Sequence, residues 1–169
     1  MRELTGSDDG AGLRIAIVAA LWNESIVRRL VDGALATLRA RGVGDDAIRV
    51  AWVPGSFELP TAASWFAPPR DAAGAPDAPA VATAADAVIA LGCVIRGETE
   101  HFRLVADAAA QGLLGVSLAS GTPVANGVLA VEDAAQAEAR SGGEHGNVGA
   151  QAALAAIRMA NLRAGRLAS

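Results

Sequence analysis

Few side chains in this sequence can transfer a proton near neutral pH. The chain has two histidines, His101 and His145, a single cysteine, Cys93, and no tyrosine, and all 14 of its cationic residues are arginine. Because it lacks lysine, it cannot form a lysine Schiff base, attach pyridoxal phosphate or carry a Walker A lysine. Proton transfer therefore falls mainly to the histidines, the cysteine and any carboxylate with a perturbed pKa.

His101 belongs to a stretch in which an apolar run, a glycine-containing turn and a helix start follow one another. Residues 88–91 predict a buried parallel strand, and Gly92 and Gly97 allow a sharp bend or the close approach of a ligand. Thr99 is a good N-cap for the helix that follows. The first turn of such a helix attracts anions, because its amides are unpaired and its dipole is positive. A histidine there is a candidate acid or base, or else a solvent-exposed residue without a function.

Each of the other candidates has an ordinary structural explanation beside the functional one. Trp22 follows the first predicted strand, where its ring either packs or stacks on a planar ligand. Glu58, next to Phe57, is a ligand for a polyol or simply a carboxylate at a helix start. Cys93 has apolar neighbours, which is typical of a buried, unreactive thiol. Arg140 ends a short helix, where it complements the dipole or binds phosphate.

Alternating strands and helices must position these residues. The predicted strands cover residues 13–20, 48–53, 88–91 and 124–131. The predicted helices begin near residues 23, 58, 99, 132 and 150, and the third ends near Gly112 or Gly115. This alternation predicts a three-layer α/β/α sandwich with a four-stranded parallel sheet, flavodoxin-like in type. In such sheets the ligand crevice lies beyond the carboxyl ends of the strands. Three of the turns there are residues 21–23, 54–58 and 93–99.

The length of 169 residues predicts one domain. Residues 1–12 are polar and glycine-rich, which predicts a flexible N-terminal segment or an exchanged edge segment. The domain proper then spans residues 13–169. Within it, residues 68–83 have no apolar period and predict a surface insertion, and residues 141–149 predict a glycine-rich loop.

The overall composition excludes several classes of protein. A net charge of −4 without a basic cluster argues against a nucleic-acid partner. No run approaches the roughly 20 uninterrupted apolar residues of a membrane span, and no signal peptide is recognisable. A single cysteine and two distant histidines predict neither a disulfide framework nor a metal site, and favour the cytoplasm. The apolar fraction of 52% favours surface buried against other subunits.

Three sequence blocks, AWVPGSFELP, LGCVIRGETEHF and AAIRMANL, occur in the order typical of one enzyme family. Weaker matches are TPVANGVLAVEDAAQAEAR and GN-G. From residue 13 to residue 162, outside the insertion, the chain resembles the 6,7-dimethyl-8-ribityllumazine synthases of riboflavin biosynthesis. The resemblance implies a transferase that condenses 5-amino-6-(D-ribitylamino)uracil with 3,4-dihydroxy-2-butanone 4-phosphate, releasing phosphate and water. It implies no cofactor. The pyrimidine substrate supplies the amine that forms the imine, so an enzyme without lysine can catalyse this reaction.

The resemblance also implies which residues bind the substrates. Trp22 corresponds to an aromatic platform under the pyrimidine ring, residues 56–58 to the segment that holds the ribityl chain, and residues 93–95 to a turn whose backbone reads the heterocycle. The implied substrate-binding residues are Trp22, Ser56, Phe57, Glu58, Cys93, Val94, Ile95, Glu98, Thr99, Asn126 and Arg140.

Residues 98–99 correspond to the helix start that binds phosphate, and His101 corresponds to the proton-transfer residue. Arg140, from the same or a neighbouring subunit, corresponds to the partner cation. Two positions depart from the family. Asn126 stands where many members have a phenylalanine against the heterocycle, and Val148 where many have a lysine near the phosphate. The first departure predicts looser stacking, and the second a higher Michaelis constant for the phosphorylated substrate.

The family resemblance further implies a homopentamer, or twelve pentamers closed into an icosahedral capsid of 60 subunits, with active sites at subunit interfaces. Two other interpretations remain open at this point. The departures at Asn126 and Val148 are compatible with a flavin-binding or shell-forming homologue that has lost activity. The related archaeal-type riboflavin synthase shares the fold and the pentamer, although the His101 block and the turn at residues 56–58 favour the lumazine enzyme.

Overall fold

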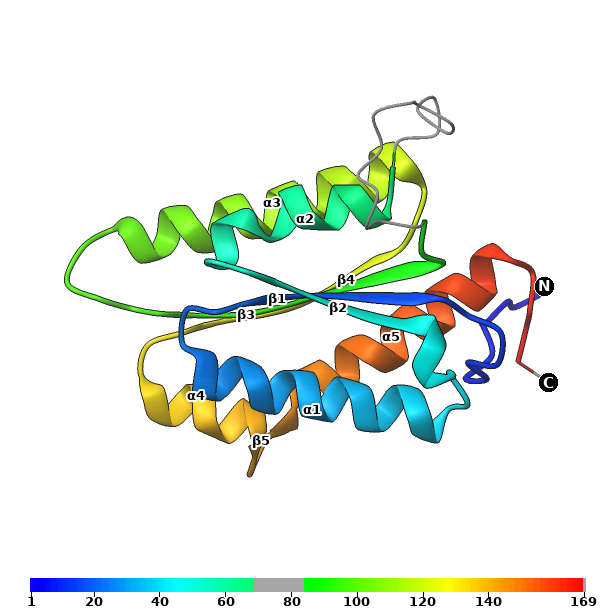
Figure 1. Ribbon diagram of the computed structural model, residues 1–169, viewed down its shortest axis with the longest axis horizontal. Helices are drawn as coiled ribbons and strands as arrows, with labels where there is room; N and C mark the ends of the chain where they lie inside the picture. Colours follow the sequence, from blue (N-terminus) through cyan, green and yellow to red (C-terminus); the bar gives the residue numbers. More distant parts are fainter. Residues whose placement is uncertain (69–83, 169) are drawn as a thin grey trace.

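The computed structural model describes residues 1–68 and 84–168. At its centre a parallel sheet lies between helices (Figure 1). The strand order is β2-β1-β3-β4. The strands are β1 (Ile15–Ala20), β2 (Ile48–Val53), β3 (Ala87–Ile95) and β4 (Val124–Val131). This order is the one expected for a flavodoxin-like sheet. The second and fourth strands begin and end at the predicted residues.

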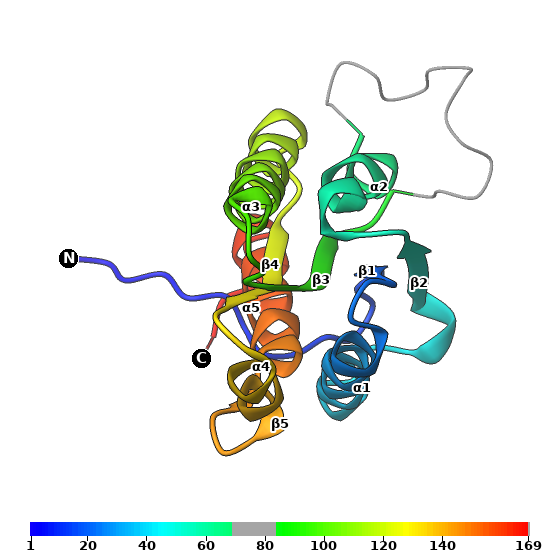
Figure 2. The same ribbon diagram turned by 90° about the vertical axis from the view of Figure 1, so that its left-hand side faces the viewer.

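Helices cover both faces of the sheet (Figure 2). One layer contains α2 (Leu59–Phe66) and α3 (His101–Ser120), and the other contains α1 (Glu24–Ala40), α4 (Ala134–Arg140) and α5 (Val148–Arg163). Every residue of β1 is buried, because alternate side chains enter alternate cores: Ile15 and Ile17 pack on the side of α1 and α5, and Val18 on the side of α2 and α3. The predicted three-layer α/β/α architecture is confirmed.

The third strand and the third helix are both longer than predicted. β3 continues through Gly92 to Ile95, so Gly92 is not a turn residue. A Cβ at Gly92 would lie 2.5 Å from Ser56 Oγ, and one at Gly112 would lie 2.7 Å from the Pro60 ring. Both glycines therefore allow close packing inside regular elements, and the predicted helix end near Gly112 or Gly115 is wrong. α3 ends at Gly121, which adopts φ 67°.

The predicted loop at residues 141–149 contains a small hairpin, β5 (Ser141–Gly143) and β6 (Gly146–Asn147). α5 begins at Val148, two residues earlier than predicted, because Asn147 caps it by accepting a hydrogen bond from the Ala150 N–H at 3.1 Å. The Asn147 amide also donates to the Arg29 carbonyl at 2.8 Å, which fixes the hairpin against α1.

The N-terminal segment lies against α5 and the last residues of its own chain. Asp8 forms ion pairs with Arg158 and Arg41. The buried Asn161 amide donates to the backbone carbonyls of Ser7 and Asp9 at 2.8 and 2.7 Å. These contacts give the segment defined partners within one chain. The predicted insertion, apart from residue 68, lies outside the described residues.

Among the described residues, α3 is the one helix long and apolar enough to cross a membrane, by length and composition alone. In this chain its buried residues Ala109 and Leu113 pack on the sheet side. Its opposite side exposes Leu104, Leu114 and Leu118, at 67, 59 and 75%. An apolar stripe of this size on the outside of a helix indicates a surface that is covered by another element.

Candidate active site

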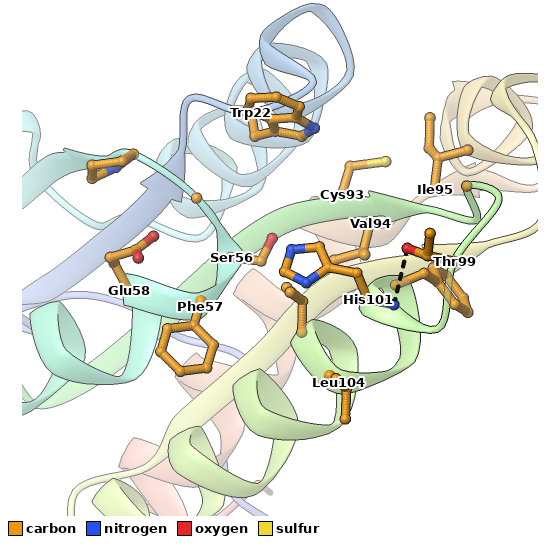
Figure 3. Close-up of a pocket in the computed structure, with 15 residues that line it drawn as sticks. Trp22, Ser56, Phe57, Glu58, Cys93, Val94, Ile95, Thr99, His101 and Leu104 are labelled. Atoms are coloured by element: carbon orange, nitrogen blue, oxygen red, sulfur yellow. Dashed lines mark hydrogen bonds between the residues drawn. The ribbon is translucent and has the colours of Figure 1, made fainter.

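A pocket of about 730 Å³ lies beyond the carboxyl ends of β1, β2 and β3, next to the start of α3 (Figure 3). This is where a parallel α/β sheet is expected to bind its ligand. The volume is in the range of ordinary small-molecule sites. The walls come from segments far apart in the sequence: Trp22, residues 54–58 and the stretch from Cys93 to Val105.

Trp22 stands at the edge of the pocket with its side chain largely exposed, at 73%. Two backbone hydrogen bonds join its turn to the end of β2, from Leu21 N–H to the Val53 carbonyl at 2.8 Å and from Trp22 N–H to the Pro54 carbonyl at 3.1 Å. The indole is therefore held on a fixed backbone while its face stays open to a ligand. Such a ring can act as a stacking platform.

Asn23 was missed as a site residue by the sequence analysis. It stands before α1, as predicted, but its side chain does not cap the helix. Its amide donates instead to the Cys93 carbonyl at 2.9 Å, and its backbone adopts the left-handed conformation with φ 58°. Asparagine tolerates this conformation better than most residues, and strained backbone is concentrated at functional sites. Asn23 thus joins the Trp22 turn to the end of β3.

The turn after β2 presents one buried and two exposed side chains. Ser56 is buried, with its hydroxyl close to Gly92 of β3, whereas Phe57 and Glu58 are exposed. Residues Ser56–Glu58 form a 3₁₀ turn that leads into α2. The tight contact at Gly92 sets the position of this turn, so Phe57 and Glu58 stand at the pocket with their outer atoms free for a ligand.

Cys93 lines the pocket but its thiol is not available for chemistry. The residue is 1% exposed, and burial raises the pKa of the thiol to about 11. The predicted burial of Cys93 is confirmed, and we expect the thiol to be protonated and unreactive at neutral pH. Val94 and Ile95 follow it along β3 and are half-buried. The end of β3 therefore presents mainly backbone atoms to a ligand.

The start of α3 lies one residue later than predicted, because Glu100 and not Thr99 occupies the N-cap position. α3 begins at His101, and the Thr99 hydroxyl accepts a hydrogen bond from the His101 backbone N–H at 3.4 Å. Glu100, at the N-cap position, makes no side-chain cap. The His101 ring is exposed and points from the helix start toward Ser56 (Figure 3). An imidazole and the unpaired amides of a 20-residue helix therefore face the same pocket.

Nine of the twelve predicted site residues line this pocket, and three do not. The nine are Trp22, Ser56, Phe57, Glu58, Cys93, Val94, Ile95, Thr99 and His101. Glu98 is exposed on the preceding turn. Asn126 is exposed on the edge strand β4, where its Oδ1 accepts a hydrogen bond from the Val128 N–H at 3.0 Å. Arg140 is half-buried at the end of α4, where its guanidinium donates to the Gln136 carbonyl at 3.1 Å.

A flavodoxin-like domain with an exposed aromatic ring, a carboxylate and a histidine at a helix start beside one pocket has the features expected of an enzyme that binds a planar ligand next to an anion. The profile of the family described as 6,7-dimethyl-8-ribityllumazine synthase matches residues 12–164. The chain belongs to this family, and it is a transferase of riboflavin biosynthesis.

Curated relatives agree with the family match over most of the chain. The chain is 50% identical, over 88% of each sequence, to the 6,7-dimethyl-8-ribityllumazine synthase of Xanthomonas campestris pv. campestris (strain B100). It is 48% identical, over 88% of each, to the protein of that name from Xanthomonas oryzae pv. oryzae (strain PXO99A). It is 47% identical, over 90% of each, to the one from Xylella fastidiosa (strain 9a5c).

Proposed function

We propose that this enzyme condenses 5-amino-6-(D-ribitylamino)uracil with 3,4-dihydroxy-2-butanone 4-phosphate to 6,7-dimethyl-8-ribityllumazine, and that the pocket beside α3 is its active site. The observation that carries the proposal is the convergence of three distant segments, at Trp22, residues 56–58 and residues 93–101, on one cavity. The second and third of these segments belong to sequence blocks that resemble the family.

The pyrimidine substrate occupies the side of the pocket formed by Trp22 and the ends of β2 and β3. The indole stacks on the planar ring, and the backbone of residues 93–95 hydrogen-bonds to its polar edge. The exposed carboxylate of Glu58 accepts hydrogen bonds from the ribityl hydroxyls. No charged catalytic group is required on this side, because the substrate amine is itself the nucleophile.

The butanone phosphate occupies the side next to α3. Thr99 and the first amides of the helix bind its phosphate, as expected for a helix N-terminus. The 5-amino group of the pyrimidine attacks the carbonyl carbon and water leaves to give an imine, after which phosphate is eliminated. The ribitylamino nitrogen then closes the second ring on the remaining carbonyl carbon with loss of another water, and His101 moves the protons in these steps. Most of the rate enhancement comes from holding the two substrates side by side. The reaction needs no cofactor.

A neighbouring subunit completes the site with Arg140 and Asn126. Two features support a homo-oligomer of this kind: both side chains lie outside the pocket of their own chain, and α3 exposes Leu104, Leu114 and Leu118. The assembly is a pentamer, alone or as twelve pentamers in an icosahedral capsid, and it works in the cytoplasm. Light scattering distinguishes the two sizes.

The reaction is tested by mixing the purified protein with both substrates and following formation of the fluorescent lumazine above the spontaneous rate. We expect acceleration, with a raised Michaelis constant for the butanone phosphate because Val148 supplies no cation at the start of α5. A folded, assembled protein that binds flavin and does not accelerate the reaction would contradict the proposal, and would identify a binding or shell-forming homologue.

A further inference from the structure

The loop between β3 and α3 carries Thr99 and leads directly into His101, yet it has little support of its own. A Cβ added at Gly97 would meet no atom of the described residues within 4 Å. The hydrogen bond from His101 N–H to the Thr99 hydroxyl, 3.4 Å long, lies within the loop and does not connect it to the sheet. The direction of the His101 ring therefore depends on how the two ends of the loop are held.

Arg96 holds both ends. Its backbone N–H donates to the Val131 carbonyl at 2.9 Å, which continues the pairing of β3 with β4. Its side-chain Nε lies 3.0 Å from Oε2 of Glu132, and its guanidinium carbon lies 5.7 Å from the centre of the Phe102 ring. Phe102 immediately follows His101. One guanidinium thus contacts residues on both sides of the loop and anchors them to the end of β4.

The anchoring residue, Glu132, is itself fixed to the start of α4. Its backbone N–H donates to the side-chain oxygen of Gln136 at 3.1 Å, and Asp133 caps the same helix by accepting from the Gln136 N–H at 2.8 Å. Arg140 ends this helix. Arg96 therefore connects the loop that leads into α3 to the turn that positions the predicted phosphate-binding arginine.

We propose that Arg96 is a positioning residue for the condensation: by bridging Glu132 and the Phe102 ring, it sets the start of α3 and with it the direction of the His101 imidazole. The inference rests on the proposed role of His101. A planar guanidinium can pair with a carboxylate and stack on a ring at the same time, which an ammonium group does less well. Misplacing a catalytic group by about 1 Å can cost about 10²-fold in rate, whereas an exposed ion pair adds little to folding stability.

The test compares Arg96→Ala and Arg96→Lys with the parent enzyme in the lumazine assay. We expect Arg96→Ala to lower kcat by roughly 10- to 100-fold while KM for the ribitylaminouracil changes by less than about twofold. Arg96→Lys should recover only part of the loss. Arg39→Ala is the matched control, because Arg39 forms a similarly exposed ion pair with Asp45, at 2.7 Å, at the far end of α1. Its kcat should equal that of the parent.

A double-mutant cycle with Glu132→Gln shows whether Arg96 acts through this contact. If it does, the double variant is no slower than Arg96→Ala alone. The proposal is overturned if Arg96→Ala retains kcat within about twofold of the parent, or if the two losses multiply. Light scattering identifies any variant that fails to assemble, and Glu132→Gln then serves as the test. If His101→Ala leaves kcat unchanged, the proposed function of His101 fails instead.

Discussion

The predicted site residues fall into two regions that differ in how one chain uses them. Those at the ends of β1, β2 and β3 and on the turns that follow, except Glu98, converge on a single pocket. Asn126 and Arg140, on β4 and α4, lie outside it. The first region contains an aromatic ring that can stack on a planar ligand, Trp22, and a histidine that can transfer a proton, His101. The second adds the amide of Asn126 and the positive charge of Arg140. Under the proposed function, one chain carries two incomplete halves of a site, which two neighbouring chains complete.

The two regions also differ in what holds their side chains. In the first, contacts between strands fix the backbone, such as the hydrogen bond from Asn23 to the Cys93 carbonyl, and Trp22 and Phe57 stay exposed. In the second, the polar groups bond within their own element in the part of the chain that the structure describes: Asn126 to Val128, and Arg140 to Gln136. Local hydrogen bonds of this kind are easily replaced by hydrogen bonds to a ligand. The two side chains can therefore reorient toward a neighbouring subunit at little cost in free energy.

The largest effect is expected in the first region, at His101. His101→Ala should lower kcat by about 10²–10⁴-fold, the usual contribution of a general acid or base, and should leave the assembly intact because the ring is exposed. Turnover is measured by lumazine formation, with the folded state checked by circular dichroism. His145→Ala is the comparison variant, since His145 lies on the β5–β6 hairpin and does not line the pocket of its own chain. Equal turnover in the two variants would remove His101 from the chemistry.

A smaller effect, on binding, is expected in the second region. Arg140→Ala should raise KM for the butanone phosphate by roughly 10- to 100-fold, since hydrogen bonds to charged groups contribute about 1.5–3 kcal/mol. Val148→Lys should lower the same KM by restoring a cation where the family often has one. Steady-state kinetics with each substrate varied in turn measures both. An unchanged KM in Arg140→Ala would separate this arginine from the phosphate.

Two substitutions of Asn23 test how far this residue stabilises the backbone of the first region. Asn23→Gly should lower the free energy of unfolding by about 1 kcal/mol, because it removes the hydrogen bond to Cys93. Asn23→Ala should cost roughly 1–2 kcal/mol more, because alanine is strained at φ 58° and glycine is not. Both variants should raise KM for the ribitylaminouracil by loosening the Trp22 turn. Denaturant titration at fixed protein concentration measures the stabilities; identical values for the two variants would show that the backbone strain is unimportant.

The smallest effect is expected far from both regions, at Asp8. The hydrogen bond from Arg158 holds the pKa of this carboxyl below its ordinary value of 3.8. A lowered pKa in the folded state stabilises the fold above the unfolded-state pKa, and this contribution is lost as the pH falls through the folded-state value. The Tm of wild type should therefore exceed that of Asp8→Asn at pH 7, and the difference should close below about pH 4. A constant difference would show that the Asp8 charge plays no part. Wild type and Asp8→Asn should have the same kcat.

The periodicity of apolar residues was sufficient to predict the sheet and its layers, because buried parallel strands and amphipathic helices have distinct patterns. It was insufficient for features that depend on contacts between distant residues. Gly92 and Gly112 were predicted to break elements, and they lie inside them because Ser56 and Pro60 approach closely. The short β5–β6 hairpin has too few apolar residues to produce a pattern.

The site was predictable where its residues share a block with the family resemblance. Glu58 and His101 were identified in this way, and Trp22 by its place in the wider resemblance, although each has an ordinary structural explanation when considered alone. The bond from Asn23 to Cys93 spans 70 residues of sequence and left no local signal except an asparagine at a helix start, which predicts a cap. Arg96 was missed for the same reason: its partners Glu132 and Phe102 meet it only in the folded chain.

The most direct measurement is complementation between two inactive variants. His101→Ala and Arg140→Ala are co-expressed with different affinity tags, the mixed assembly is purified, and its lumazine synthesis is measured. If neighbouring subunits share each site, about a quarter of the sites in a one-to-one mixture contain both native residues, and activity should return to about that fraction of the wild-type value. If both residues act within the same chain, no site contains both, and the mixed assembly should be no more active than the two variants alone.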